Sequence, residues 1–212
     1  MRLSSDGAVV VMHDATLERT TNGTGDLARL TLKQLRRFDA GYHFGPHTHP
    51  YRDRGITIPT AQEALDETRP LPVIVEVKTI EAAEPLLALI RARADEGRVT
   101  VGSFVTGALL PFRRAGLRTT ASFAEVRALL FPAVLGLRRH KLPFSVMSIP
   151  QRYKGMPLPL GALARCVAPA GVKVDVWTVN DPGDALRLWR KGVAAVLSDD
   201  PQRILEARKA LG

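Results

Sequence analysis

The sequence has a single cysteine, few aromatic residues and no long apolar segment. Because Cys166 has no partner, the fold cannot depend on an internal disulfide bond. No apolar run approaches the roughly 18 residues of a membrane-spanning helix, which predicts a chain without a transmembrane segment. Residues 1–7 also lack the apolar core of a signal peptide. We therefore expect a globular protein that is located in the cytoplasm.

The charge is basic but lacks the long runs of one sign that mark a nucleic-acid-binding arm. Lys and Arg number 30 against 21 Asp and Glu, which gives a formal net charge of +9 and an isoelectric point near 10.3. No run reaches five or six like charges. Aromatic residues make up only 6% of the chain and are not interleaved with the arginines as a base-stacking platform requires. We interpret the excess as solvated arginine and predict no nucleic-acid partner.

Beyond residue 60, short apolar runs alternate with segments of helical periodicity. We expect strands at 73–77, 99–103, 117–120, 145–149, 173–179 and 193–198, each followed by a helix. Such alternation predicts an α/β fold with a parallel sheet and outer helices. Periodicity alone does not separate a doubly wound sheet from a (β/α)8 barrel. The absence of a glycine-rich dinucleotide loop after any strand disfavours a nucleotide-binding sheet.

Polar residues follow several of these strands, where ligands of parallel α/β folds bind. Glu76 and Lys78 are two residues apart in one strand, so their side chains are expected on the same face. Inside a barrel, such charges must be paired or must hold a metal or a phosphate. A purely structural buried ion pair is the alternative. Further polar strand ends are His13-Asp14, Ser103, Trp177 to Asn180 and Ser198-Asp199.

His13 begins the most distinctive segment, which continues to Gly25 through a run of Thr, Asn and Gly. A histidine at a strand end is a candidate acid or base, because its pKa usually lies near neutrality. The residues after it favour a loop built on hydrogen bonds from side chains to the backbone.

Residues 39–58 form the one irregular stretch, rich in Gly, Pro, His and Arg, and we predict an insertion loop there. His43, His47 and His49 lie close enough in sequence to bind Zn2+ together. The segment has no cysteine and no carboxylate at ligand spacing, so we do not assign a metal site to it.

Taken together, these motifs resemble the glycerophosphodiester phosphodiesterase family. The shared motifs run through nearly the whole chain in order: H-D-x-x-L-x-R-T-T-N-G-T-G at 13–25, L-T-L at 30–32, D-A-G-Y at 39–42, I-P-T at 58–60, E-x-K at 76–78, S-F at 103–104, W-T-V-N-D at 177–181 and S-D-D-P at 198–201. The first and the W-T-V-N motif are specific, whereas I-P-T and S-F alone are weak.

The resemblance implies a (β/α)8 TIM barrel that hydrolyses small-molecule glycerophosphodiesters to glycerol 3-phosphate and an alcohol. It implies a divalent cation, Mg2+ or Ca2+, and two histidines as acid and base. His13 matches the second histidine, Glu76 a metal-binding carboxylate and Lys78 the lysine near metal and phosphate. Trp177 matches a residue that lines the pocket. A hard cation bound by carboxylates would neutralise the phosphate, and a lysine charge suits the same group.

Two motifs of the family are absent from this sequence: the H-R-G of its first strand and the E-x-D of its second. The chain therefore lacks the family's first catalytic histidine, a phosphate-binding arginine and two metal-binding carboxylates. We therefore predict one domain over 1–212 that is an N-terminally incomplete barrel, without the first strand, the first helix and most of the second strand. A misassigned start or shortened chain, or else a degenerate homologue, would explain the difference.

The missing motifs also lead us to predict that this chain is inactive or strongly impaired as a phosphodiesterase. One alternative is a non-catalytic barrel that binds phosphate or lipid headgroups through Lys78 and surface arginines. Another is a different metal-dependent phosphodiesterase on the same barrel, such as a phospholipase.

Overall fold

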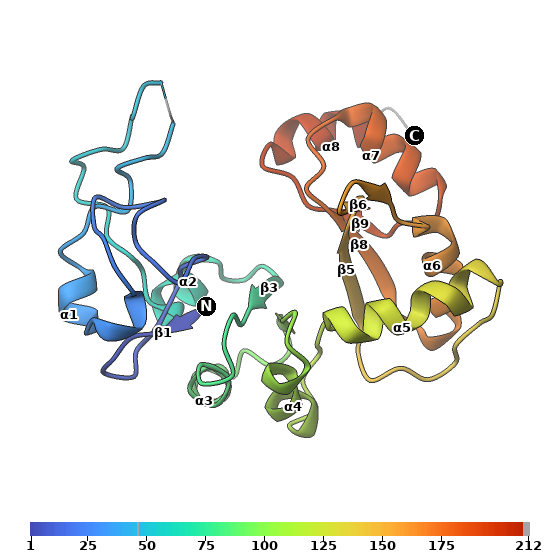
Figure 1. Ribbon diagram of the computed structural model, residues 1–212, viewed down its shortest axis with the longest axis horizontal. Coiled ribbons are helices and arrows are strands. Elements are labelled where there is room, and N and C mark those ends of the chain that lie inside the picture. Colours follow the sequence, from blue (N-terminus) through green and yellow to red (C-terminus); the bar gives the residue numbers. More distant parts are fainter. Residues whose placement is uncertain (46, 210–212) are drawn as a thin grey trace. The chain divides into compact units, whose positions relative to one another are not determined.

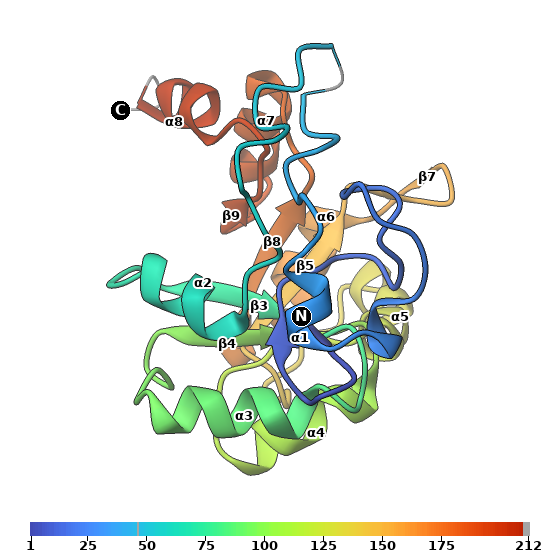
Figure 2. The same ribbon diagram turned by 90° about the vertical axis from the view of Figure 1, so that its left-hand side faces the viewer.

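The computed structural model describes residues 1–45 and 47–209 and divides into two compact units, Met1–Leu117 and Arg118–Gly212 (Figures 1 and 2). Each unit contains helices together with parallel strands, so the predicted α/β class is confirmed. Within the described ranges, no helix has both the length and the apolar character needed to cross a membrane.

The first unit begins with a short hairpin. Strand β1 (Arg2–Leu3) pairs antiparallel with β2 (Val9–Val10). The turn between them is tied to the following segments, because Asp6 Oδ1 accepts hydrogen bonds from the Ser4 hydroxyl and the Leu32 backbone N–H. A 3-10 turn η1 (Leu27–Arg29) and helix α1 (Leu32–Leu35) follow. A small apolar core lies beneath them, formed by Val10, Met12, Leu17, Leu27, Leu35 and Ile58.

The larger core of the first unit surrounds the parallel pair β3 (Val73–Glu76) and β4 (Val99–Gly102), in which Glu76 is opposite Gly102. Three helices contribute buried side chains to this core: α2 (Ala61–Glu67), α3 (Ala83–Ala92) and α4 (Thr106–Arg114). Figure 2 shows α3 and α4 lying side by side below the two strands. The strands predicted at 73–77 and 99–103 are confirmed.

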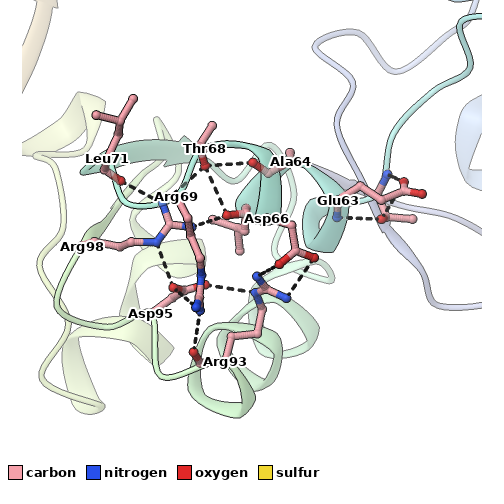
Figure 3. A network of polar contacts seen from close by, with 11 residues as sticks. Glu63, Ala64, Asp66, Thr68, Arg69, Leu71, Arg93, Asp95 and Arg98 are labelled. Carbon is pink, nitrogen blue, oxygen red and sulfur yellow. Dashed lines mark hydrogen bonds and ion pairs between the residues drawn. The ribbon is translucent and has the colours of Figure 1, made fainter.

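A polar network closes the end of this unit where β3 and β4 begin (Figure 3). Asp95 is buried and accepts hydrogen bonds from Arg69, Arg93 and Arg98 at 2.8 to 3.0 Å. Arg98 also donates to the Leu71 carbonyl at 2.8 Å, and Arg93 pairs with Asp66. The network joins the end of α2 to the segment between α3 and β4, so it fixes the start of both strands.

The second unit is built on a three-stranded parallel sheet of order β5 (Val146–Pro150), β8 (Lys173–Trp177), β9 (Ala195–Val196). The helices are α5 (Phe123–Val134), α6 (Leu160–Val167), α7 (Pro182–Arg190) and α8 (Pro201–Lys209), with a 3-10 turn η2 (Ala168–Ala170) after α6. Asp181 caps α7 by accepting from the Asp184 backbone N–H at 2.8 Å, and Pro182 occupies its first position, as the D-P pair predicts. A hairpin of β6 (Arg152–Tyr153) and β7 (Met156–Pro157) follows β5.

The barrel expected from the resemblance is not closed within the described residues, whose strands form four separate sheets. The strand predicted at 117–120 is reduced to a single bridge, Thr120 to Val146, and that predicted at 193–198 to Ala195–Val196. Residues 39–58 contain turns and no helix or strand, with residue 46 outside the described part. The truncation of the barrel and the single domain over 1–212 stay predictions, and residues 210–212 lie outside the described part.

Candidate functional site

The candidate site is centred on the ion pair at the carboxyl end of β3. Lys78 Nζ donates a hydrogen bond to Glu76 Oε2 at 2.6 Å, which confirms that the two side chains share a face. The Lys78 side chain is only 12% exposed, whereas that of Glu76 is 35% exposed. The other carboxylate oxygen, Glu76 Oε1, is buried and accepts no hydrogen bond from the described residues. The pair thus has one oxygen with unused acceptor capacity.

His13 is oriented by a carboxylate that is itself held by an arginine. His13 Nδ1 lies 2.6 Å from Asp14 Oδ1, and Arg19 pairs with the same carboxylate through Nε and Nη2. The hydrogen bonds from Arg19, and then from His13, hold the pKa of Asp14 well below its usual range. Asp14 therefore stays ionised near neutral pH and favours the His13 tautomer with its proton on Nδ1, which leaves Nε2 for proton transfer.

Hydrogen bonds connect the His13 and Lys78 backbones to Arg2 and Met1, the first residue of β1 and the residue before it. The Lys78 backbone N–H donates to the Met1 carbonyl at 3.0 Å. Arg2 Nε donates to the His13 carbonyl at 3.1 Å. Because Met1 and Arg2 are adjacent, the segments that follow β2 and β3 and carry the predicted histidine and lysine both contact the start of the chain. The structure thus brings three predicted site residues, His13, Glu76 and Lys78, to one region of the first unit.

The loop after His13 is built as the sequence predicts, from side-chain to backbone hydrogen bonds. Thr21 Oγ1 donates to the Leu17 carbonyl at 2.9 Å and accepts from the Gly23 N–H at 3.0 Å. Glu18 accepts from the Gly25 N–H at 2.7 Å. Gly23 packs against Phe38, where a Cβ atom would come within 2.5 Å of the ring. These contacts fix the loop that carries Arg19.

The second unit has its own polar strand ends. Trp177 is the half-buried last residue of β8, opposite Pro150 of β5. Three residues further on, Asn180 Oδ1 accepts from the Ser198 hydroxyl and the Asp199 N–H at 2.9 Å, which ties the end of β8 to that of β9. Asn180 of the W-T-V-N motif and Ser198 and Asp199 of the S-D-D-P motif thus have a structural role, because they hold the two strand ends together. A role of Trp177 in lining a pocket stays a prediction.

The residues of this region do not form a complete divalent-cation site. Mg2+ and Ca2+ prefer about six oxygen ligands, several of them from carboxylates in a tight site. Glu76 offers one free oxygen beside a lysine cation, and both oxygens of Asp14 are engaged. Among the described residues, no group of three or more His, Cys, Asp or Glu could hold a metal, and His43, His47 and His49 do not form one.

A family model described as the glycerophosphoryl diester phosphodiesterase family matches residues 1–203, almost the full chain. The chain belongs to this family. A glycerophosphodiester phosphodiesterase of Caldanaerobacter subterraneus is 29% identical over 97% of this chain and 82% of its own length. The glycerophosphodiester phosphodiesterase of Bacillus subtilis is 26% identical over 99% of this chain and 75% of its own length.

Solved structures of this phosphodiesterase family share the fold. The phosphodiesterase domain of an uncharacterized Mycobacterium tuberculosis protein superimposes with a TM-score of 0.80 at 24% identity, covering 99% of this chain and 85% of that one. A phosphodiesterase of Oleispira antarctica, solved with its product sn-glycerol 3-phosphate, gives 0.73 at 25% identity and covers 98% and 82%.

The sequence predicts His13 as a site residue, whereas the contacts of Asp14 with His13 and Arg19 were not predicted. Asp14 and Arg19 lie within the H-D-x-x-L-x-R motif, so the spacing of a carboxylate beside the histidine and an arginine five residues later carried the signal.

Proposed function

We propose that the site of the first unit is built to hydrolyse glycerophosphodiesters to glycerol 3-phosphate and an alcohol, and that this chain performs the reaction weakly or not at all. Membership in the phosphodiesterase family supports the reaction. The contact that carries the proposal is the Lys78–Glu76 ion pair, in which a mostly buried ammonium group lies just after the carboxyl end of β3.

His13 is proposed as a proton-transfer group. With its Nδ1 proton directed to Asp14, its Nε2 atom can take a proton from an attacking hydroxyl group or give one to the departing alkoxide as the P–O bond breaks. Asp14 is a positioning residue, because it acts through the imidazole. Arg19 holds Asp14 in place. The arrangement resembles the histidine–carboxylate unit of other hydrolases in its logic, in that the carboxylate selects the tautomer.

Lys78 is proposed to bind the phosphate. An ammonium group suits phosphate as a point charge. In this chain, however, the same group is neutralised by Glu76 at 2.6 Å. A phosphate that approaches Lys78 therefore meets a carboxylate as well, and its binding is weak unless that carboxylate is neutralised or removed.

Impaired turnover follows from the groups that this chain lacks. The family uses two histidines for acid–base catalysis, and only His13 matches one of them. A single carboxylate, Glu76, does not form a cation site. We derive no step through a cation: the Mg2+ or Ca2+ that the resemblance implies needs more carboxylate ligands than this region offers.

The test is release of glycerol 3-phosphate from sn-glycero-3-phosphocholine by the purified chain, with and without Mg2+ or Ca2+, compared with His13→Gln. His140→Gln is the matched control, since His140 is exposed and lies outside the site. We expect release near background in all three proteins. Robust release that requires a cation and is lost in His13→Gln, but not in His140→Gln, would refute the impairment.

A non-catalytic phosphate-binding protein is the second candidate, favoured by the same burial of Lys78. It predicts saturable binding of sn-glycerol 3-phosphate that depends on Lys78, with no turnover at any enzyme concentration. Slow but measurable turnover that His13→Gln abolishes would instead assign the chain to the impaired enzyme.

A further inference from the structure

The outer side of α5 in the second unit exposes a group of bulky apolar side chains. Phe131 is 72% exposed, and Val134, Leu135 and Leu137 are each more than half exposed. The opposite side of the same helix buries Leu129 and Ala133 in the core. A helix that is apolar on both sides is usually covered on both. We therefore expect a binding partner to cover the exposed side of α5.

Four exposed basic residues, at 138–141, directly follow the apolar group. Hydrogen bonds at the C-terminal end of α5 fix the backbone that joins the two. The Leu137 N–H donates to the Pro132 carbonyl at 2.9 Å, and the Gly136 N–H donates to Ala133 at 3.0 Å. Gly136 has a φ of +73°, which completes a Schellman-type helix end. The Arg139 N–H then donates to the Cys166 carbonyl of α6 at 2.8 Å. We call the resulting surface the α5 patch: Phe131, Val134, Leu135, Leu137, Arg138, Arg139, His140 and Lys141.

The charge around the α5 patch has one sign over a long stretch of sequence. Residues 126–174 contain no Asp or Glu and eight Lys or Arg. This segment of the second unit therefore contributes nearly all of the chain's net charge of +9. The basic residues are Arg127, Arg138, Arg139, Lys141, Arg152, Lys154, Arg165 and Lys173.

We propose that the α5 patch binds the surface of an anionic lipid bilayer. Apolar side chains would enter the boundary between headgroups and acyl chains, and the neighbouring cations would contact anionic headgroups. A second copy of the chain fits less well, because a two-fold interface would bring the same cations together. Nucleic acid fits less well too, because three of the four apolar residues are aliphatic and cannot stack on bases.

The experiment measures co-sedimentation of the full chain with vesicles of phosphatidylcholine mixed with phosphatidylglycerol, and with vesicles of phosphatidylcholine alone. We expect binding to the anionic vesicles only. Raising the salt from roughly 0.1 M to 1 M shortens the Debye length from about 10 Å to about 3 Å and should release most of the protein. The measurement reads no turnover, so it is independent of the proposed hydrolysis.

Two variants test the two parts of the α5 patch, each against a matched control elsewhere in the second unit. Phe131→Ser should weaken partition about tenfold, whereas Leu205→Ser, at a comparably exposed position of α8, should leave it unchanged. Arg138→Ser with Lys141→Ser should weaken it about thirtyfold. Arg203→Ser with Lys191→Ser removes the same charges from exposed positions and should have at most a severalfold effect.

Circular dichroism and thermal melting of each variant show whether the fold is retained. Absence of binding by the wild-type chain, or equal losses in patch and control variants, would overturn the proposal. Self-association in light scattering that Phe131→Ser abolishes, without vesicle binding, would assign the α5 patch to a second copy instead.

Discussion

Lys78 and Glu76 form an ion pair at the end of β3 in which each charge largely cancels the other, with Nζ and Oε2 2.6 Å apart. Lys78 is the more buried partner, and Glu76 keeps one buried oxygen without a hydrogen bond among the described residues. Such a pair attracts an anion weakly as it stands. If Lys78 binds phosphate as proposed, removing or balancing the Glu76 charge is expected to strengthen that binding.

Asp14 is expected to set the tautomer of His13. In Asp14→Ala, the hydrogen bond from Nδ1 is lost and the imidazole should shift toward the Nε2–H tautomer that predominates in free histidine. Long-range 1H–15N NMR above neutral pH distinguishes the two forms. His140 serves as the internal reference. An unchanged His13 spectrum in Asp14→Ala would show that the carboxylate does not orient the ring.

Asp95 is expected to stabilise the first unit strongly, because it is buried among three arginines (Figure 3). Removing one charge of a buried network leaves its partners uncompensated, so Asp95→Asn should lower the free energy of unfolding by about 3 kcal/mol. Asp66→Asn is the matched control: its carboxylate is 54% exposed, and its loss should cost less than about 1 kcal/mol. Urea unfolding measures both. Equal costs would mean that burial does not set the energetics of the network.

The Asp95 contribution should also depend on pH. Burial raises the pKa of this carboxyl group, but hydrogen bonds from Arg98 and Arg93 outweigh it, so the pKa lies below its usual value of 3.8. The folded state then binds the proton less readily than the unfolded state. The contribution is complete above about pH 4 and is lost as the pH falls below that value. The difference between wild type and Asp95→Asn should therefore shrink on acidification below pH 4, and a constant difference would contradict this assignment.

Gly23 is expected to be required by packing and not by backbone conformation. A Cβ atom at this position would lie 2.5 Å from the Phe38 ring, so Gly23→Ala should destabilise the first unit by roughly 1–3 kcal/mol. Gly25→Ala is the comparison: it has open space but a φ of +97°, with an expected cost of about 1 kcal/mol. Phe38→Leu combined with Gly23→Ala should recover part of the loss in thermal melting. If the double variant is no more stable than Gly23→Ala, the clash is not with the Phe38 ring.

The parts of the fold that depend on local pattern were predictable. Strict alternation placed Glu76 and Lys78 on one face, and the D-P pair at 181–182 marked the start of α7. The loop after His13 was predictable from its Thr, Asn and Gly residues. In each case, the residues that decide the structure are within a few positions of one another.

The parts that depend on distant partners were not predictable. The arginines that surround Asp95 include Arg69, which is 26 residues away in sequence. The strand expected at 117–120 is a single bridge from Thr120 to Val146, next to hydrogen bonds of Thr119 and Ala121 with the start of β5 and the residue before it. The Asp14–Arg19 pair lay within a motif, yet its role became clear only when both oxygens of Asp14 were seen to be engaged.

The affinity for sn-glycerol 3-phosphate of wild type, Glu76→Gln and Lys78→Met, measured by calorimetry with and without Mg2+, tests the central claim most directly. The ion-pair account predicts weak binding in wild type, binding at least severalfold tighter in Glu76→Gln, none in Lys78→Met and no effect of Mg2+. Binding that Mg2+ strengthens and Glu76→Gln abolishes would contradict it, because Glu76 would then act as a ligand of a working cation site.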